Sequence, residues 1–304
     1  MTQIYSFPTV ISSSMLSDFK ACPAKFFYNN VAEWKSKGAN VHLHAGGAFA
    51  KGMEAARTAF FVNGLSADES VAMGLQALLL AYGDFECPSD SAKSAVNMAG
   101  AFEFYFDRYP LGNDGTEPVT FASGRKAIEF SFAHPLPINH PETGDPILFS
   151  GRMDAILKAF GGRFVTDEKT TSQLGASWSK QWDLRSQFTG YCWGARESGE
   201  PVNGVLVRGI SILKTRFDTL QAVSYRPDWQ IDRWYTEMLS WVEDAIRMWK
   251  QDYYRHNLDE SCSSYGGCPL RQICMTQPDE RQPFLETYFE RRHHDSITGK
   301  DTLL

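Results

Sequence analysis

Two strand-like segments joined by a pair of glycines place the strongest constraint on how this chain folds. Residues 147–160 and 163–170 are short apolar or alternating stretches, a pattern typical of β-strands. Gly161 and Gly162 stand between them, and such a pair favours a tight hairpin turn. The sequence therefore predicts two paired strands near the middle of the chain, around which the other elements must pack.

Helical periodicity dominates the chain before this hairpin and returns after it. In the first third, apolar residues recur at three- and four-residue spacing, which predicts helices over residues 14–28, 46–61, 67–82 and 91–109. Outside the hairpin, further strands are predicted over 126–132, 205–213 and 220–225, and further helices over 177–197 and 228–254. This order indicates a mixed α/β fold. We expect one composite domain with a helical part (1–118), a core (119–227) and a C-terminal part (228–304).

Composition excludes several classes of protein. The 304 residues are 43% hydrophobic and 22% charged, which is too apolar for a disordered chain. The sequence contains neither an apolar run of about 20 residues nor a secretory signal at its start, so we expect a soluble cytoplasmic protein without membrane contact. The net charge of −6 excludes bulk attraction to nucleic acid, so any such contact requires a local basic groove.

Acidic residues lie at matching places on the two hairpin strands. Asp154 falls within the first strand, and Asp167 and Glu168 are followed by Lys169 at the end of the second. Converging carboxylates suit a hard divalent cation such as Mg²⁺ or Mn²⁺. Lys169 should point to the same side as Asp167, because side chains alternate along a strand. Two carboxylates and an ammonium group around a metal are the components of a site for phosphodiester hydrolysis.

The next predicted helix presents Gln187 and Tyr191 four residues apart, on one face, where they could hydrogen-bond a phosphate or a base. Taken together, the motifs Gly-x-x-Asp (151–154), Asp-x-Lys (167–169) and Gln-x-x-x-Tyr (187–191) resemble the RecB-like branch of the PD-(D/E)XK nucleases. That branch includes the CRISPR-associated RecB-like exonucleases and the AddB nuclease subunit. The resemblance implies a restriction-endonuclease-like core, with a mixed central sheet flanked by helices. It also implies catalytic roles for Asp154, Asp167, Lys169, Gln187 and Tyr191.

The resemblance further predicts a metal-ligating histidine on an early helix, and here the chain departs from the pattern. Ala50 occupies the position where the histidine is expected. Glu54 lies one helical turn further on, on the same face, and could supply an oxygen ligand instead. His42 and His44 are alternative donors just before that helix, and Glu129 is a further acidic candidate. The predicted metal ligands are therefore Asp154, Asp167, Glu168 and Glu54.

Four of the six cysteines form a second candidate metal site. Cys262, Cys268 and Cys274 are evenly spaced near the C-terminus, and Cys22 lies near the other end of the chain. Four thiolates suit either a [4Fe-4S] cluster or tetrahedral zinc, and the spacing alone does not decide between them. Iron-sulfur members of the RecB-like branch place one cysteine before the core and three after it, which favours [4Fe-4S]. Cys87 and Cys192 have no partner at ligand spacing and are expected to be structural.

DNA is the substrate that the resemblance implies, either single-stranded or at its ends, cleaved by an exonuclease. A positive patch and stacking surface are expected from Lys169, Lys180, Arg185, Arg208, Lys214 and Arg216, with Trp178 and Trp182. The sequence lacks a phosphate-binding motif of motor proteins, so a helicase or recombinase would be a separate partner. Recombination in phages or mobile elements and CRISPR spacer processing, in a bacterial or phage-infected cell, would suit such a protein. Two alternatives are a catalytically weak DNA-binding scaffold subunit, favoured by the missing histidine, and a zinc-ribbon regulator.

Overall fold

The computed structural model describes residues 5–38, 40–263, 267–295, 297–298 and 300–303. The chain separates into two compact units, which are described in turn. One consists of residues 39–130 and 153–231 and is called the hairpin unit below; the other consists of residues 1–38, 131–152 and 232–304 and is called the cysteine unit. Two of the boundaries between the units fall within strands, one between residues 130 and 131 and one between residues 152 and 153. No helix in the described stretches combines the length and hydropathy needed to cross a lipid bilayer.

The hairpin unit is built on a mixed sheet. Strands β5 and β6 are joined by the tight turn at Gly161, whose φ of 75° is easily adopted by glycine. β6 pairs in parallel with β7, and β7 pairs antiparallel with β8, giving the order β5-β6-β7-β8, with the short β3 beside β5. The bounds are β3 (Glu117–Pro118), β4 (Ile128–Asn139), β5 (Pro146–Ala159), β6 (Gly162–Thr171), β7 (Gly204–Ile212) and β8 (Phe217–Tyr225). Strand β4 pairs with β5, and residues 131–139 of β4 and 146–152 of β5 belong to the cysteine unit.

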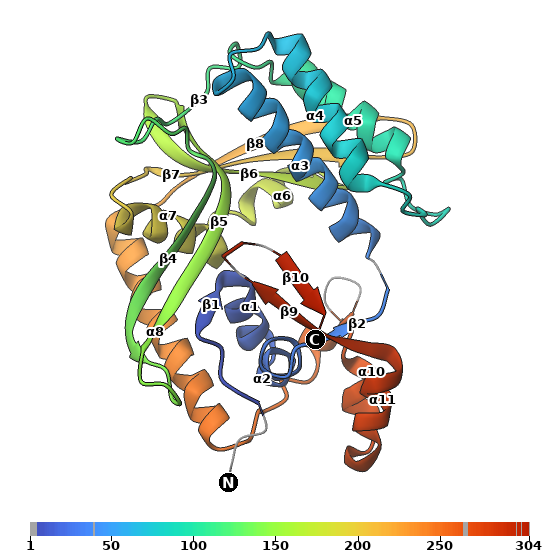
Figure 1. The fold of residues 1–304 in the computed structure, drawn as a ribbon, viewed down its shortest axis with the longest axis vertical. Helices are drawn as coiled ribbons and strands as arrows, with labels where there is room; N and C mark the ends of the chain where they lie inside the picture. Colours follow the sequence, from blue (N-terminus) through green and yellow to red (C-terminus); the bar gives the residue numbers. More distant parts are fainter. Residues whose placement is uncertain (1–4, 39, 264–266, 296, 299, 304) are drawn as a thin grey trace. The chain divides into compact units, whose positions relative to one another are not determined.

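Helices cover both faces of this sheet. On one face, α3 (Val41–Phe61) and α5 (Ala95–Arg108) share a core with Ile210 and Ile212 of β7, and α4 (Ala67–Tyr82) packs along α3 (Figure 1). On the other, Trp178 of α6 (Ala176–Lys180) packs against Gly209, and α7 (Ser186–Glu197) contacts β6 and β7. Residues 209 and 210 point to opposite faces because side chains alternate along a strand. The predicted fold class, a mixed sheet flanked by helices, is confirmed.

Local signals define the helix ends in the hairpin unit. Ser66 and Glu69 form a reciprocal capping box at the start of α4, which satisfies two backbone donors. Asn40 at the start of α3 and Ser94 at the start of α5 are simple caps, whose side-chain oxygens accept hydrogen bonds from backbone N–H groups of the first turn. The predicted helix 67–82 matches α4, whereas the predicted continuous helix 177–197 is wrong, because residues 181–185 interrupt it between α6 and α7.

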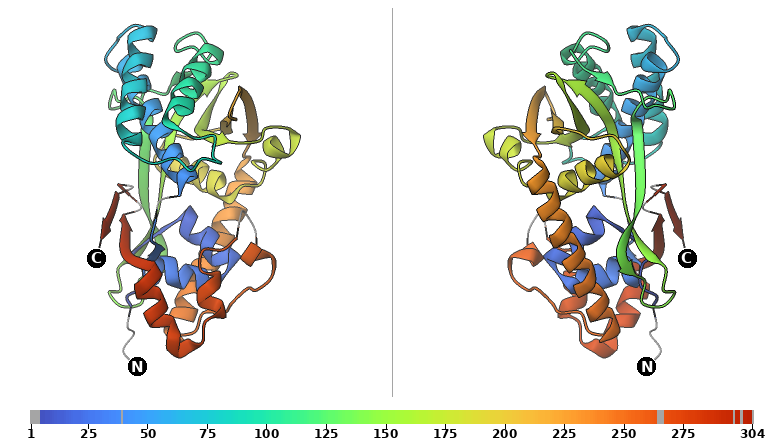
Figure 2. Two further views of the ribbon diagram at one scale, coloured as in Figure 1. Left: turned by 90° about the vertical axis from the view of Figure 1, so that its right-hand side faces the viewer. Right: turned by 90° about the vertical axis from the view of Figure 1, so that its left-hand side faces the viewer.

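The cysteine unit combines both ends of the chain. Strand β1 pairs in parallel with the start of β5, and Figure 2 shows α8 beside α1 and α2, where the rings of Phe19 and Trp241 are in contact. A second, three-stranded sheet has the order β10-β9-β2. The bounds are β1 (Val10–Ser12), α1 (Ser13–Ala21), α2 (Pro23–Phe26), the π-helical η1 (Phe27–Val31), β2 (Trp34–Ser36), α8 (Asp228–Lys250), α9 (Glu260–Ser263), α10 (Arg271–Met275), the 3₁₀ turn η3 (Pro278–Glu280), α11 (Arg281–Tyr288), β9 (Phe289–Asp295) and β10 (Lys300–Leu303).

The predicted helix 14–28 is broken in the structure. Cys22 adopts an extended backbone conformation, and Pro23 begins α2 in the first-turn position that suits a residue without an N–H. The C-terminal strands β9 and β10 were not predicted. β10 pairs with β9 as a local antiparallel hairpin, whereas β9 pairs with β2 from the other end of the chain, a partner that local periodicity cannot indicate. The three-part domain division of the sequence analysis stays a prediction.

Candidate active site

The β5–β6 hairpin brings the predicted acidic residues to one level of the sheet. Ala155 pairs with Thr166 in the antiparallel register, so Asp154 and Asp167 follow directly on neighbouring strands. The backbone N–H of Glu168 donates a hydrogen bond to Oδ2 of Asp154, with an N–O distance of 3.0 Å. The Asp154 carboxylate therefore reaches across to the strand that carries the Asp-x-Lys motif.

Asp167 and Lys169 form an ion pair on one side of β6. Nζ of Lys169 lies 2.7 Å from Oδ1 of Asp167, and the side chains are 36% and 6% exposed. Lys169 therefore offers an ammonium group to solvent beside a nearly buried carboxylate. Burial alone would lower the pKa of Lys169, but the charges of Asp167 and Asp154 raise it overall, so the group is protonated at neutral pH.

The two aspartates resist being charged together. Burial raises the pKa of Asp154 well above its usual range, and the neighbouring charges of Asp167 and Glu168 raise it further. Burial also raises the pKa of Asp167, although Lys169 opposes that shift. Glu129 is among the acids that raise the pKa of Asp154. Surplus buried negative charge is an environment that a divalent cation would relieve.

Gln187 and Tyr191 lie on α7 at this same side of the sheet. Nε2 of Gln187 donates to the Tyr191 hydroxyl at 2.9 Å, so the predicted pair shares one helix face. Tyr191 is 7% exposed, and its pKa is raised by burial and by the charge of Asp167. Five predicted site residues therefore come from β5, β6 and α7 of a single unit: Asp154, Asp167, Lys169, Gln187 and Tyr191.

The other two predicted ligands have basic partners. Glu168 points to the opposite face of β6, where its carboxylate forms a two-point ion pair with Arg57 of α3. Glu54, on the same helix, forms an ion pair with Lys51 at 2.6 Å and has a side chain that is 33% exposed. Ala50 is half-buried on α3, where the predicted histidine is missing. Of the alternative donors, His42 is exposed, and His44 bonds the carbonyl of Tyr82 and stacks on Phe85.

Sequence reasoning missed Arg57 and Tyr105. Arg57 is 4% exposed, and the Tyr105 hydroxyl of α5 donates to Oε1 of Glu168 at 3.2 Å. A signal for Arg57 was present. It follows Met53 by one turn within the predicted helix 46–61, and an arginine in an apolar stripe indicates a buried countercharge.

Part of the predicted DNA-binding surface is wrong. Arg208 is 3% exposed, paired with Asp114 at 2.6 Å and stacked over the Tyr109 ring, so it cannot offer its charge to a phosphate. Trp178 and Trp182 are both 7% exposed and pack against each other instead of offering stacking surface. Lys180, Arg185, Lys214 and Arg216 are exposed.

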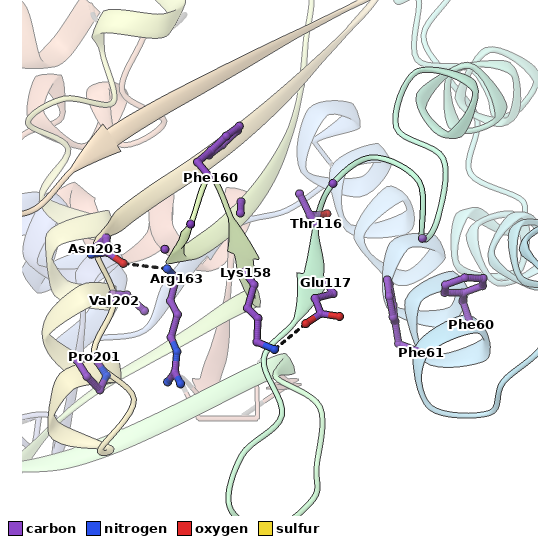
Figure 3. A pocket seen from close by; sticks show the side chains of 15 residues that line it. Phe60, Phe61, Thr116, Glu117, Lys158, Phe160, Arg163, Pro201, Val202 and Asn203 are labelled. Carbon is purple, nitrogen blue, oxygen red and sulfur yellow. Dashed lines mark hydrogen bonds and ion pairs between the residues drawn. The ribbon is translucent and has the colours of Figure 1, made fainter.

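A cavity of about 1150 Å³ lies at the turn end of the hairpin, apart from these carboxylates (Figure 3). Its wall includes the exposed Phe160, Lys158 paired with Glu117, and Arg163, whose backbone N–H donates to the Asn203 side chain. None of the predicted catalytic residues lines it.

In the cysteine unit, all four predicted thiol ligands line one small cavity. Cys22, Cys262, Cys268 and Cys274 share its wall with Lys25 and Tyr28. The Cys268 N–H donates to the Cys262 carbonyl, and the Asn257 N–H donates to the sulfur of Cys22. Burial raises the pKa of Cys274, and the charges of the other three cysteines raise it further. We call this the four-cysteine cavity. Cys192 is buried and Cys87 half-buried elsewhere.

Within the described parts of the chain, no group of three or more His, Cys, Asp or Glu side chains is arranged to hold a metal ion. At both candidate sites suitable donors are present, but they would have to move closer together to bind a cation. For the four-cysteine cavity the donor set is soft and sulfur-based; for the hairpin site it is hard and oxygen-based.

Comparisons with known proteins were made against families, curated sequences and solved structures. A family model described as the PD-(D/E)XK nuclease superfamily matches residues 10–275. A crystal structure of a "putative exonuclease" from Eubacterium rectale aligns with 89% of this chain and 94% of its own, at 12% identity and a TM-score of 0.51, a likeness of fold. The crystal structure of SSO0001 aligns with 66% of this chain and 74% of its own, at 16% identity and a TM-score of 0.28. The search of curated proteins found no match.

Proposed function

Because the chain belongs to the PD-(D/E)XK nuclease superfamily, we propose that it is a metal-dependent deoxyribonuclease that hydrolyses phosphodiester bonds in single-stranded DNA or at DNA ends. The observation that carries this proposal is the meeting of Asp154, Asp167 and Lys169 on adjacent strands, within reach of Tyr191. Exonuclease action is supported by the name of the Eubacterium rectale protein of the same fold.

Asp154 and Asp167 would hold Mg²⁺ or Mn²⁺, the ions that enzymes of this superfamily generally use. A bound divalent cation supplies Lewis-acid stabilisation of the phosphate and lowers the pKa of water. The raised pKa values of both aspartates mean that metal binding must displace protons, so metal affinity should increase with pH. Glu54 and Glu168 are not needed as ligands in this proposal, since Lys51 and Arg57 engage them.

Lys169 would stabilise the negative charge that develops on the phosphate oxygens. Its ammonium group is held by Asp167, remains protonated and is partly open to solvent, as electrostatic catalysis requires. Gln187 and Tyr191 would hydrogen-bond the DNA backbone beside the metal. The phenol stays protonated because burial and Asp167 raise its pKa, so it can donate a hydrogen bond to a phosphate oxygen.

The four-cysteine cavity would hold a structural [4Fe-4S] cluster, with zinc as the alternative. The support is the convergence of four thiols from both ends of the chain on one cavity. Assays of iron, sulfide and zinc in protein purified without oxygen distinguish these groups. Iron and sulfide at about four each per chain would support the cluster. One zinc per chain would instead indicate a zinc site. The absence of both iron and zinc would show that the cysteines are unligated.

The nuclease proposal is tested with the full chain and labelled DNA. Linear single strands, circular single strands and linear duplexes are incubated with Mg²⁺, with Mn²⁺ or with chelator. We expect linear single strands to be degraded only with metal and circles to resist. Asp167→Asn and Lys169→Met should abolish cleavage, whereas Asp218→Asn, an exposed aspartate of the same unit, should not.

A catalytically weak scaffold subunit is the second candidate. Its support is Ala50, where relatives are expected to carry a metal-ligating histidine, together with the Lys51 contact of Glu54. DNA binding without cleavage under all these conditions would favour the scaffold over the nuclease. If Ala50→His then produced cleavage, the missing ligand would be the reason for the inactivity.

A further inference from the structure

The middle residue of the Asp-x-Lys motif is buried on the opposite side of its strand from Asp167 and Lys169. The side chain of Glu168 is 2% exposed, so its charge has almost no contact with water. A buried charge of this kind persists only with firm partners.

Two helices supply those partners. Nη1 and Nη2 of Arg57 lie 2.9 and 2.5 Å from the two carboxylate oxygens of Glu168, a fork-to-fork geometry that fixes orientation as well as distance. The Tyr105 hydroxyl of α5 donates to Oε1 at 3.2 Å. Each carboxylate oxygen therefore has a donor, and together the donors hold the side chain from α3 and α5.

The helices themselves are closely packed. A methyl group added at Gly52 of α3 would approach Phe102 of α5 to 2.7 Å and the Gly74 carbonyl of α4 to 2.9 Å. Such contacts allow little sliding of α3, so Arg57 projects from a fixed support. The Glu168 side chain thus ties β6 to a rigid layer.

The main chain of the same residue reaches the proposed metal site. Its N–H donates to Oδ2 of Asp154, and its neighbours in β6 are Asp167 and Lys169. Fixing the Glu168 side chain fixes this peptide group, and the peptide group orients the Asp154 carboxylate. Outer partners of this kind commonly alter metal affinity or activity by about 10–100-fold.

We infer that Arg57, Tyr105 and Glu168 form a positioning clamp that orients Asp154, and with it the divalent metal, from the face of β6 opposite to the chemistry. The inference rests on the proposed nuclease function and deepens it. It assigns Glu168 to positioning through its peptide group and its partners, and not to the metal's inner shell. Arg57 and Tyr105 are positioning residues, because they act through Glu168.

If the Arg57–Glu168 ion pair were merely structural, a different result would be expected. Loss of such a pair would lower thermal stability without changing metal affinity at a separate point. The matched control is Leu78→Ala, a fully buried residue of α4 in the same helical layer, whose truncation destabilises the fold without touching Glu168.

The test measures Mn²⁺ binding by titration calorimetry in the absence of DNA, and kcat and KM on single-stranded DNA, for full-length protein. For Glu168→Gln we expect Mn²⁺ affinity and kcat each to fall about 10-fold or more, with KM for DNA within about twofold. Tyr105→Phe removes one hydroxyl with little risk to folding, and we expect affinity to fall about threefold to fivefold. Leu78→Ala should lower the unfolding temperature and leave affinity and kcat within about twofold.

Unchanged Mn²⁺ affinity in both Glu168→Gln and Tyr105→Phe would overturn the clamp, even if wild-type protein cleaves DNA and Asp167→Asn does not. Equal losses in Leu78→Ala would overturn it too. If wild type binds Mn²⁺ but cleaves no DNA, the nuclease proposal fails, while weaker Mn²⁺ binding in the two variants still supports the clamp. A wild-type protein that bound no Mn²⁺ would overturn the clamp and the metal role of Asp154 together.

Discussion

The carboxylate site and the four-cysteine cavity are both candidate metal sites, but the chain builds them in opposite ways. Asp154, Asp167 and Lys169 project from long paired strands whose register is fixed by backbone hydrogen bonds. The four cysteines lie on or beside elements of four or five residues, with Cys22 at an extended break before α2. The paired strands position the side chains of the carboxylate site, whereas in the four-cysteine cavity a bound metal would hold the short elements in place.

The charges around the two sites also differ. The carboxylate site carries its own cations, Lys169 on one face and Arg57 on the other, which hold acids in place before any metal arrives. In the four-cysteine cavity, burial and neighbouring thiols raise the pKa of Cys274 and, with smaller opposition from Lys25, that of Cys268. Those thiols stay protonated without a metal, so metal binding there must release protons and should be coupled to folding.

The largest expected effect is on stability at the four-cysteine cavity. Cys274→Ser should abolish metal incorporation and greatly destabilise the cysteine unit, since structural metal sites contribute on the order of 10 kcal/mol to folding. Mn²⁺ binding at the carboxylate site should persist if the hairpin unit stays folded. Metal analysis, thermal unfolding and calorimetry check the three statements. Full metal content and an unchanged unfolding temperature in Cys274→Ser would remove the distinction between the sites.

The next effect is on catalysis at the carboxylate site, with little loss of stability. Asp167→Asn removes a proposed metal ligand and should slow cleavage by about 10³-fold or more, which corresponds to about 4 kcal/mol. The same change removes the charge that raises the pKa of Asp154, so the metal-free protein should become no less stable, and more stable by up to about 1 kcal/mol. Cleavage kinetics and urea unfolding measure the two effects. A marked loss of stability would show that the Asp167–Lys169 pair supports the fold.

A third prediction concerns the buried ion pair that supports the carboxylate site. Arg57→Met leaves Glu168 buried without its countercharge and should lower the free energy of unfolding by about 3–5 kcal/mol. The double variant Arg57→Met/Glu168→Met removes both charges and should recover most of that loss. Urea unfolding of the three proteins gives the values. Iron or zinc content of the cysteine unit should not change, and a double variant as unstable as the single one would contradict the ion-pair explanation.

Features set by adjacent residues were predictable from the sequence. The strands expected over 147–160 and 163–170 occur as 146–159 and 162–171, because alternation and a glycine turn are local properties. The helix predicted over 177–197, which the structure divides into α6 and α7, shows where local signals fail. Arg226 donates to the Trp182 carbonyl and the Thr189 hydroxyl, so a side chain from a distant segment holds the interruption between α6 and α7. No spacing within 177–197 could indicate that partner.

The candidate site divides in the same manner. The positions of Asp154, Asp167 and Lys169 follow from strand spacing, whereas the partner of Glu168 depends on how α3 packs over the sheet. Arg57 and Arg208 look alike in sequence as isolated arginines, and both become buried countercharges through tertiary contacts. The roles of the site residues in catalysis stay predictions that the experiments above test.

The smallest expected effect concerns stability, and it contrasts Lys169 of β6 with Lys93, whose side chain bonds to the same strand. Nζ of Lys93 is held by Oγ1 of Thr170 at 2.9 Å, and the residue is 5% exposed. Carboxylates raise the pKa of Lys169, but burial lowers that of Lys93 from 10.5 to about 8. Between about pH 8 and 10.5 the unfolded chain binds the extra proton, so stability should rise with pH over that window. Below pH 8 the cost of burying the charge is constant.

Lys93→Met removes that cost. A shift of this size corresponds to at most roughly 3 kcal/mol, and the lost hydrogen bonds to Thr170 offset about 1 kcal/mol of it. The variant should therefore be more stable than wild type by about 1–2 kcal/mol at pH 7, and the difference should shrink and then reverse as the pH rises towards 10. Urea unfolding at several pH values measures this, with Lys180→Met, an exposed lysine, as the control. A stability difference that did not vary with pH would mean that the charge of Lys93 is fully compensated in the folded protein.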